Sequence, residues 1–271
     1  MSEIVAVVFD WAGTVLDFGC LAPVRALQAA FAAEGVEISE AQARKDMGRA
    51  KRDHVAALMA DADVAKAWSR KFGKPHAEAD VDRLYKALEP LMEREAAEHT
   101  KLIPGAAAIV AWLKSEGVKI GSGTGYTRAM MAGILPRAAA QGYAPDVVVC
   151  AGETKSGRPS PLPMWKALVE LGAYPAWRCV KVDDAVVGIE EGRAAGAWTV
   201  GVAASGNGVG LSFEAWQALS SSERARLGAA AEAQLRDAGA DYVIPTVADL
   251  KDVIADIARR IAHGERPPQV V

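Results

Sequence analysis

Runs of apolar, mostly β-branched residues recur along the chain, and each run ends at or just before a small or acidic residue. They cover residues 4–9, 118–122, 146–150, 179–182, 198–202 and 242–244. Strands that are apolar without alternation are buried on both faces, which is typical of a parallel sheet. The pattern therefore predicts a set of parallel strands at these positions.

Segments with a helical pattern lie between these runs. They cover residues 106–115, 127–140, 163–171, 188–195 and 247–262. Strands that alternate with helices predict an open α/β sheet. An alanine-rich segment, residues 220–238, is a further predicted helix that the serines at 220–222 would cap. The tail 264–271 is expected to be frayed.

The stretch 20–99 breaks this alternation, because it contains helical patterns and no convincing strand. Residues 24–34 form one such pattern, and Val81, Leu84, Leu88 and Leu91 follow the 3/4 spacing of a helix in another. The pair Pro104-Gly105 marks the point where the α/β pattern begins again.

These boundaries predict two domains. An α/β core would comprise residues 1–19 and 100–271, and a helical domain would comprise residues 20–99. The two segments where the chain crosses between them, 17–22 and 99–104, are expected to act as hinges.

Composition excludes several classes of protein. Apolar residues make up 51% of the 271 residues, charged residues make up 24%, and the net charge is −3. This balance argues against a nucleic-acid-binding protein, and no apolar run reaches the ~18 residues of a membrane span. Residues 4–9 are too short for a signal-peptide core and no basic region precedes them, which argues against secretion. Cys20, Cys150 and Cys179 are scattered, so we expect no disulfide scaffold or zinc module and a cytoplasmic location.

The candidate chemistry lies where the predicted strands end. In open α/β sheets, ligands bind outside the carboxyl ends of the strands. This rule brings together Asp10, Thr124, Arg158, Asp183 and Asp184. An aspartate can serve as a nucleophile, paired acids can hold Mg²⁺, and an arginine can bind a phosphoryl oxygen. Each residue alone has an ordinary structural explanation, but together they favour a phosphoryl site.

Four short motifs in this order resemble those of the haloacid dehalogenase superfamily. They are Phe9-Asp10-Trp11-Ala12-Gly13-Thr14, the strand end Gly121–Thr124, Gly157-Arg158-Pro159-Ser160-Pro161 and Val182-Asp183-Asp184. The resemblance implies a Rossmann-like open parallel sheet with an inserted all-helical cap. Where many members carry a further acid, this chain has Gly188 and Ile189, so Asp183 is expected to supply that charge.

Longer segments resemble a narrower group, the phosphonoacetaldehyde hydrolase (phosphonatase) family. They are residues 10–14, 18–23, 47–54, 125–128 and 191–201. The resemblance implies cleavage of the carbon–phosphorus bond of phosphonoacetaldehyde to acetaldehyde and phosphate. It also implies a homodimer.

Cleavage of a carbon–phosphorus bond would explain two residues of this chain, Ala12 and Lys51. Phosphatases of the superfamily carry an acid two residues after the nucleophile to protonate a leaving alkoxide, and this chain has Ala12 there. A phosphonate leaves through carbon, so an amine that converts the neighbouring aldehyde to an iminium would supply an electron sink. The resemblance implies that Lys51 is this Schiff-base lysine and that Asp10 attacks phosphorus.

The resemblance implies the rest of the site as well. Mg²⁺ would bind Asp10, the carbonyl oxygen of Ala12 and Asp184. The remaining predicted site residues would bind the substrate, either through its oxygens or by shaping the pocket: Thr124, Gly125, Arg158, Cys20, Met47, His54 and Tyr126. For His54, proton transfer and plain packing stay open as alternatives.

Four other functions stay open. They are a phosphoester phosphatase, a dehalogenase, a dinucleotide-binding protein that uses residues 121–126, and a binding module without activity. Ala12 argues against the first, and the acidic pair with Arg158 argues against the second. Tyr126 stands where a GxGxxG motif needs glycine, which argues against the third. The joint presence of Asp10, Lys51 and Arg158 argues against the fourth.

Overall fold

The protein is built on one six-stranded parallel sheet. The computed structural model describes residues 3–268. The strands are β1 (Ala6–Phe9), β2 (Lys119–Gly123), β3 (Val147–Val149), β4 (Cys179–Asp183), β5 (Trp198–Val202) and β6 (Tyr242–Ile244). Their order is β3-β2-β1-β4-β5-β6, and all neighbours are parallel. This is the order of a doubly wound Rossmann-type sheet, so the predicted core is confirmed.

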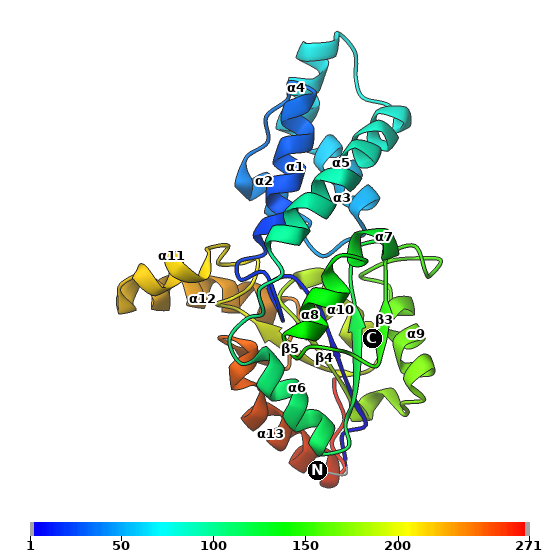
Figure 1. Ribbon diagram of the computed structural model, residues 1–271, viewed down its shortest axis with the longest axis vertical. Coiled ribbons are helices and arrows are strands. Elements are labelled where there is room, and N and C mark those ends of the chain that lie inside the picture. The colour runs from blue at the N-terminus through cyan, green and yellow to red at the C-terminus, as the bar shows by residue number, and fades with distance from the viewer. Residues whose placement is uncertain (1–2, 269–271) are drawn as a thin grey trace.

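Helices cover both faces of the sheet (Figure 1). The helices of this part of the chain are α6 (Ala106–Ser115), α7 (Arg128–Met131), α8 (Ile134–Ala140), α9 (Leu162–Leu171), α10 (Val186–Ala194), α11 (Phe213–Ala218), α12 (Ser221–Asp237) and α13 (Leu250–Ala262), with 3-10 turns at Ala176–Arg178 and Val247–Asp249. Val7 and Phe9 pack in the core that contains α6 and α13, while Ala6 and Val8 pack with α9. Burial on both faces explains why the strands show no polar alternation.

One predicted helix is wrong as a single element. The segment 127–140 forms two helices, with α7 ending at Met131 and α8 beginning at Ile134. Pro136 is the reason, because its ring lacks an N–H and clashes with the carbonyl four residues earlier. In the first turn of α8 the missing N–H has no consequence. The short helix α11 was not predicted at all.

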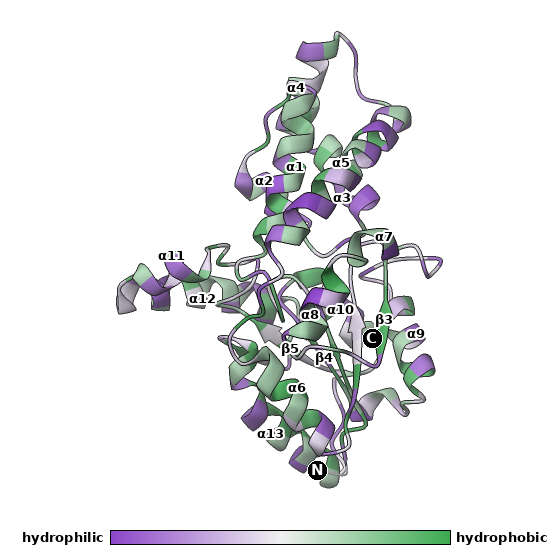
Figure 2. Cartoon of the chain, in the orientation of Figure 1, coloured by the Kyte–Doolittle hydropathy of each residue, from purple (hydrophilic) through white to green (hydrophobic). Residues whose placement is uncertain are grey.

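The chain between β1 and α6 is entirely helical. It forms α1 (Leu21–Ala33), α2 (Glu40–Lys45), α3 (Lys51–Ala60), α4 (Ala62–Phe72) and α5 (Glu78–Glu98). These helices rise from the core as a separate body (Figure 1). Helices α1 and α5 pack along one another, and Phe31, Leu84 and Leu88 are fully buried. Figure 2 shows hydrophilic residues spread among the hydrophobic ones along these helices.

The predicted all-helical cap is therefore confirmed. The division into residues 1–19 with 100–271 and residues 20–99 stays a prediction. The two connecting segments lie side by side, since Leu16 and Leu102 form an antiparallel bridge. The N–H of Asp17 donates to the carbonyl oxygen of Lys101 at 3.2 Å. This pairing places both expected hinges at one point.

The C-terminal part differs from expectation in its tail. The prediction of a capped helix over 220–238 is confirmed, because the Ser220 hydroxyl accepts a hydrogen bond from the backbone N–H of Glu223 in the first turn of α12. Together α11 and α12 project from the core (Figure 1). The expected fraying is wrong up to residue 268, since Arg266 stacks 5.0 Å from the centre of the Trp177 ring and Pro267 is buried. Residues 269–271 lie outside the described residues.

No helix within residues 3–268 is both long enough and apolar enough to cross a membrane.

Candidate active site

The three predicted acids lie at the point where the strand order reverses. Asp10 follows β1, while β4 ends at Asp183 and is followed by Asp184. Strands β1 and β4 are neighbours in the sheet, and their following loops diverge, which opens a crevice at this edge. The fold thus brings these carboxylates together as the sequence predicts.

The three carboxylates fit a divalent metal ion. One oxygen from each of Asp10, Asp183 and Asp184 lies within 4.8 Å of the others, and all three residues are buried. Burial and the charge of Asp183 raise the pKa of Asp10 to about 6. Burial, followed by the charges of Asp10 and Asp183, raises the pKa of Asp184 well above its usual range. A hard cation would relieve this repulsion, and it prefers carboxylate oxygens as ligands.

The carboxylate of Asp184 is held by the loops around it. Its Oδ1 accepts a hydrogen bond from the Thr14 hydroxyl at 3.1 Å, and its Oδ2 accepts one from the Asn207 backbone N–H at 2.7 Å. Gly13 has φ +88°, and a Cβ there would lie 2.2 Å from Asp184 Oδ2. The glycine of the first motif therefore lets the loop after β1 approach this carboxylate.

The carboxylate of Asp183 has other partners than that of Asp184. Its Oδ1 accepts the N–H of Ala185 at 3.0 Å, and its Oδ2 lies 3.1 Å from Lys181 Nζ. A Cβ at Gly188 would lie only 2.0 Å from Asp183 Cγ. The Asp183 carboxylate thus fills the space that a side chain at 188 would need, in line with its expected replacement of the missing acid.

Arg158 is the centre of a buried ion-pair network. Its Nη1 lies 2.6 Å from Asp10 Oδ1 and 3.4 Å from Asp183 Oδ2, while its Nε lies 3.0 Å from Glu191 Oε2. Burial acts to lower the pKa of Arg158, but these carboxylates outweigh burial and raise it. Among the described residues, Nη2 is buried and has no hydrogen-bond partner. The guanidinium therefore has one donor group free for a ligand.

Two members of this network were missed in the sequence. Lys181 of β4 and Glu191 of α10 are almost fully buried, and Lys181 Nζ lies 2.8 Å from Glu191 Oε2. A signal did exist, because Lys181 stands inside a run predicted to be buried on both faces. A buried charge needs a partner, so this lysine required nearby acids. Asn207 was also missed, and it lies in a loop without any recognisable pattern.

Lys51 is the first residue of α3 and is only 2% exposed. Its Nζ lies 3.9 Å from Met47 Sδ and 5.3 Å from the centre of the Tyr126 ring. Burial lowers the pKa of Lys51 to about 8, and Arg158 contributes in the same direction. The nearby Arg49 pairs with Asp46 at 3.1 Å.

Arg52, the residue after Lys51, forms its ion pairs within the cap. It pairs with Glu78 and Asp82 on α5, each at 2.8 Å. Helix α3 begins at Lys51 itself. The low pKa of this amine thus comes from burial under the closed cap.

Cap and core residues line one small cavity of about 20 Å³. Its lining includes the predicted residues Asp10, Ala12, Cys20, Met47, Lys51, Thr124, Gly125, Tyr126 and Asp184. Arg158 lines an adjacent cavity together with Thr124 and Gly125. A Cβ at Gly125 would lie 2.5 Å from the carbonyl oxygen of Arg49, so this glycine permits close contact between core and cap.

His54 does not line this cavity. It is fully buried in α3, and burial lowers its pKa to about 3, with Lys51 and Arg49 acting in the same direction. Burial also raises the pKa of the Cys20 thiol and of the Tyr126 hydroxyl well above their usual ranges. All three side chains are therefore neutral near pH 7.

Comparison with known proteins places the chain in a family. A model of the haloacid dehalogenase-like hydrolases matches residues 4–196. A phosphonoacetaldehyde hydrolase of Paraburkholderia phytofirmans is 49% identical over 267 residues, which cover 98% of this chain and 100% of the relative. The chain belongs to the phosphonoacetaldehyde hydrolase family. Another member, from Hahella chejuensis, is 45% identical and is matched over 97% of this chain and 89% of its own length.

Solved structures agree with this placement in the phosphonoacetaldehyde hydrolase family. The crystal structure of a phosphonoacetaldehyde hydrolase-like protein from Oleispira antarctica is 45% identical, with a TM-score of 0.97 over 98% of this chain and 96% of that chain. A β-phosphoglucomutase from Clostridium difficile has a TM-score of 0.69 at 17% identity, over 96% of this chain and 99% of that chain, which shows the shared fold. The protein is therefore a hydrolase of the haloacid dehalogenase superfamily.

The ion-pair network makes a prediction about Glu191. Glu191→Gln keeps the shape of the side chain but removes the charge that faces Lys181 and Arg158. Because a buried ion then lacks its partner, we expect the free energy of unfolding to fall by roughly 3 kcal/mol. Urea unfolding followed by circular dichroism measures this change.

The neighbouring Glu190 is exposed and provides a matched control. Glu190→Gln should change the free energy of unfolding by less than about 0.5 kcal/mol. Equal unfolding midpoints for the two variants would show that the network contributes nothing to stability.

Proposed function

We propose that this protein hydrolyses the carbon–phosphorus bond of phosphonoacetaldehyde to acetaldehyde and phosphate. The observation that carries the proposal is that a buried amine and a carboxylate, Lys51 and Asp10, line the same cavity. The names of the relatives support it. Ala12 also lines this cavity, so the position that would need a general acid for a phosphate ester carries none.

Lys51 performs the first step in this proposal. A pKa of about 8 leaves roughly 10% of the amine neutral at pH 7, against about 0.03% at the ordinary value of 10.5. The neutral amine adds to the aldehyde carbon, and loss of water gives an iminium. The iminium carbon is bonded to the carbon that carries phosphorus, so the iminium can accept the electron pair of the carbon–phosphorus bond.

Asp10 performs the second step. Its carboxylate attacks phosphorus, the carbon–phosphorus bond breaks, and the electron pair moves into the iminium to form an enamine on Lys51. Arg158, Thr124 and Gly125 would hold the phosphonate oxygens, with Arg158 Nη2 as the free donor. Water then cleaves the aspartyl phosphate, and protonation and hydrolysis of the enamine release acetaldehyde and free Lys51.

Asp10, Asp184 and the carbonyl oxygen of Ala12 would hold Mg²⁺. When bound, the ion reduces the repulsion between the anionic nucleophile and the anionic phosphonate. Asp183 lies within the same carboxylate cluster but is paired with Lys181, so it would act as a neighbouring charge. Cys20, Met47 and Tyr126 would shape the pocket around the aldehyde. Neutral His54 would pack behind Lys51 or accept a proton.

We also propose a cytoplasmic location and a homodimer. Three cysteines, Cys20, Cys150 and Cys179, are buried and free, which fits a reducing compartment. The dimer rests on family resemblance alone.

The first test is the product assay, together with Asp10→Asn. Purified protein should release acetaldehyde and phosphate from phosphonoacetaldehyde in equal amounts. Asp10→Asn keeps the shape of the side chain but removes the nucleophile, so turnover should fall by at least about a thousandfold. Asp237→Asn, at an exposed site on α12, should keep full activity. Wild-type protein that releases phosphate only from phosphate esters would contradict the proposal.

The carboxylate cluster predicts dependence on a divalent ion. Chelation should abolish turnover, and added Mg²⁺ should restore it. Asp184→Ala should remove both turnover and the heat of Mg²⁺ binding in calorimetry, because it deletes a ligand. Full activity after exhaustive chelation would argue against the metal and favour a dehalogenase-like site.

The amine predicts covalent trapping. Borohydride added with acetaldehyde should inactivate the enzyme and leave an ethyl group on Lys51, located by peptide mass spectrometry. Since only the neutral amine reacts, the rate of inactivation should rise as the pH increases and level off above a pH of about 8.

Lys51→Arg should lose both trapping and turnover, because arginine stays protonated. Lys155→Arg, at an exposed site in the core, should change neither. An ethyl group on Lys155 instead of Lys51 would show that the Schiff base is assigned to the wrong residue.

A further inference from the structure

The cavity between Lys51 and Asp10 is small in this structure. Its volume of about 20 Å³ is close to what a single water molecule needs. Phosphonoacetaldehyde is several times larger than water, so the cap must move away from the core to admit it. Some contact between cap and core must therefore hold the closed form and release it.

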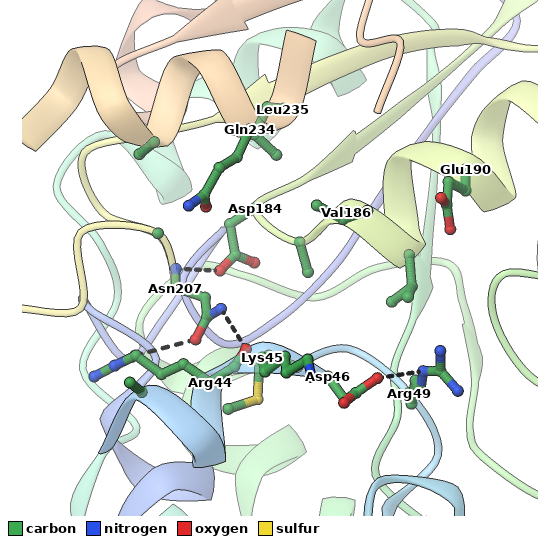
Figure 3. A pocket seen from close by; sticks show the side chains of 16 residues that line it. Arg44, Lys45, Asp46, Arg49, Asp184, Val186, Glu190, Asn207, Gln234 and Leu235 are labelled. Atoms are coloured by element: carbon green, nitrogen blue, oxygen red, sulfur yellow. Dashed lines mark hydrogen bonds and ion pairs between the residues drawn. The ribbon is translucent and has the colours of Figure 1, made fainter. Parts of the chain in front are cut away.

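Arg44 makes the densest set of polar contacts between the two bodies. It lies on α2 of the cap, and its Nη1 donates to the carbonyl oxygen of Gly19 at 2.9 Å and to Asn207 Oδ1 at 3.1 Å. Its Nη2 donates to the carbonyl oxygen of Gly210 at 2.9 Å. A second hydrogen bond runs in the opposite direction, since Asn207 Nδ2 donates to the Arg44 carbonyl oxygen at 3.0 Å (Figure 3).

The core surface is shaped to receive this guanidinium. Gly210 has φ +70°, and a Cβ there would lie 2.6 Å from Arg44 Cζ. Within the cap, Glu40 lies 2.7 Å from Arg44 Nη2, which orients the side chain toward the core. The Arg44 side chain is only 13% exposed. The contacts with Asn207 and Gly210 are lost if the cap swings open.

The contact between Arg44 and Asn207 lies beside the cavity that Asp10 and Lys51 line. Arg44 and Asn207 line a cleft of about 630 Å³ between cap and core (Figure 3). Met47 and Asp184 line both this cleft and the catalytic cavity. The backbone N–H of Asn207 also donates to Asp184 Oδ2 at 2.7 Å. The loop that receives Arg44 is thus the loop that orients the carboxylate of the candidate metal site.

We propose that Arg44 and Asn207 are positioning residues that latch the cap onto the core, so that Lys51 is buried against Asp10 only while the latch is made. The role of the latch in turnover rests on the proposed function. Its role in cap closure does not, because burial of Lys51 is a property of the protein without substrate.

The first experiment measures closure without substrate. Arg44→Met and wild-type protein are treated briefly with a water-soluble acylating reagent, and peptide mass spectrometry gives the rate at which Lys51 is labelled. Loss of the latch shifts the population toward the open form, so labelling of Lys51 should become about tenfold faster or more. Lys181 is fully buried within the core and should stay unlabelled in every variant.

A matched control removes an arginine that stays within the cap. Arg83 on α5 pairs with Glu34 at 3.1 Å and with Asp80 at 2.8 Å, and all three belong to the cap. Arg83→Met should label Lys51 at the wild-type rate. Equal labelling in Arg44→Met and Arg83→Met would overturn the latch.

A second variant decides the question if Arg44→Met unfolds and labels Lys181. Asn207→Ala removes the receiving side chain but keeps the backbone N–H that holds Asp184. It should also speed up the labelling of Lys51 with Lys181 protected, and wild-type labelling in it would overturn the proposal.

Kinetics test the consequence for turnover. Arg44→Met and Asn207→Ala should each lower kcat/KM for phosphonoacetaldehyde by about tenfold. The kcat/KM of the double variant should be no lower than that of the less active single variant, because both changes break the same contact. Fully multiplied losses would overturn a shared latch. Wild-type protein that does not act on phosphonoacetaldehyde would refute the proposed function, while the labelling result would still decide the latch.

Discussion

Repulsion among buried carboxylates is the constraint on which the rest of this site depends. Asp10, Asp183, Asp184 and Glu191 lie at one edge of the sheet, and Arg158 and Lys181 form ion pairs within this cluster. With all six groups ionised, two negative charges remain, which is the charge that one divalent cation neutralises. Burial raises the pKa of Asp10 and the charge of Asp183 adds to this effect, while the same carboxylates keep Arg158 protonated.

The cap supplies a buried amine that forms no ion pair among the described residues, whereas the buried lysine of the core, Lys181, is paired with Asp183 and Glu191. Lys51 would be an ordinary surface lysine if α3 stood away from the sheet. Burial against the core lowers its pKa toward neutrality, so in the proposed mechanism closing the cap both brings the amine to the carboxylate and raises the neutral fraction of the amine. The contact of Arg44 with Asn207 and Gly210 gives this closure a specific geometry.

The strands and the acids at their ends could be predicted because they depend on local patterns in the sequence. The strands were found because burial on both faces leaves continuous apolar runs, and Asp10, Asp183 and Asp184 were found because parallel strands end at one edge. The helix over 127–140 was wrong because a single proline outweighed a favourable pattern. The tail was wrong because a contact such as that of Arg266 with Trp177 joins residues far apart in sequence.

The sequence by itself determined the fold class, the helical insertion and the candidate residues at the strand ends, because strand and helix periodicity and the motif spacings are local properties of the chain. Only the tertiary structure decided which charges meet. Lys181 and Glu191 form an ion-pair network with Arg158, and Gly188 leaves the space that the carboxylate of Asp183 fills. The low pKa of Lys51 was likewise decided by closure of the cap, because desolvation depends on everything that surrounds a group in space and not on its neighbours in the chain.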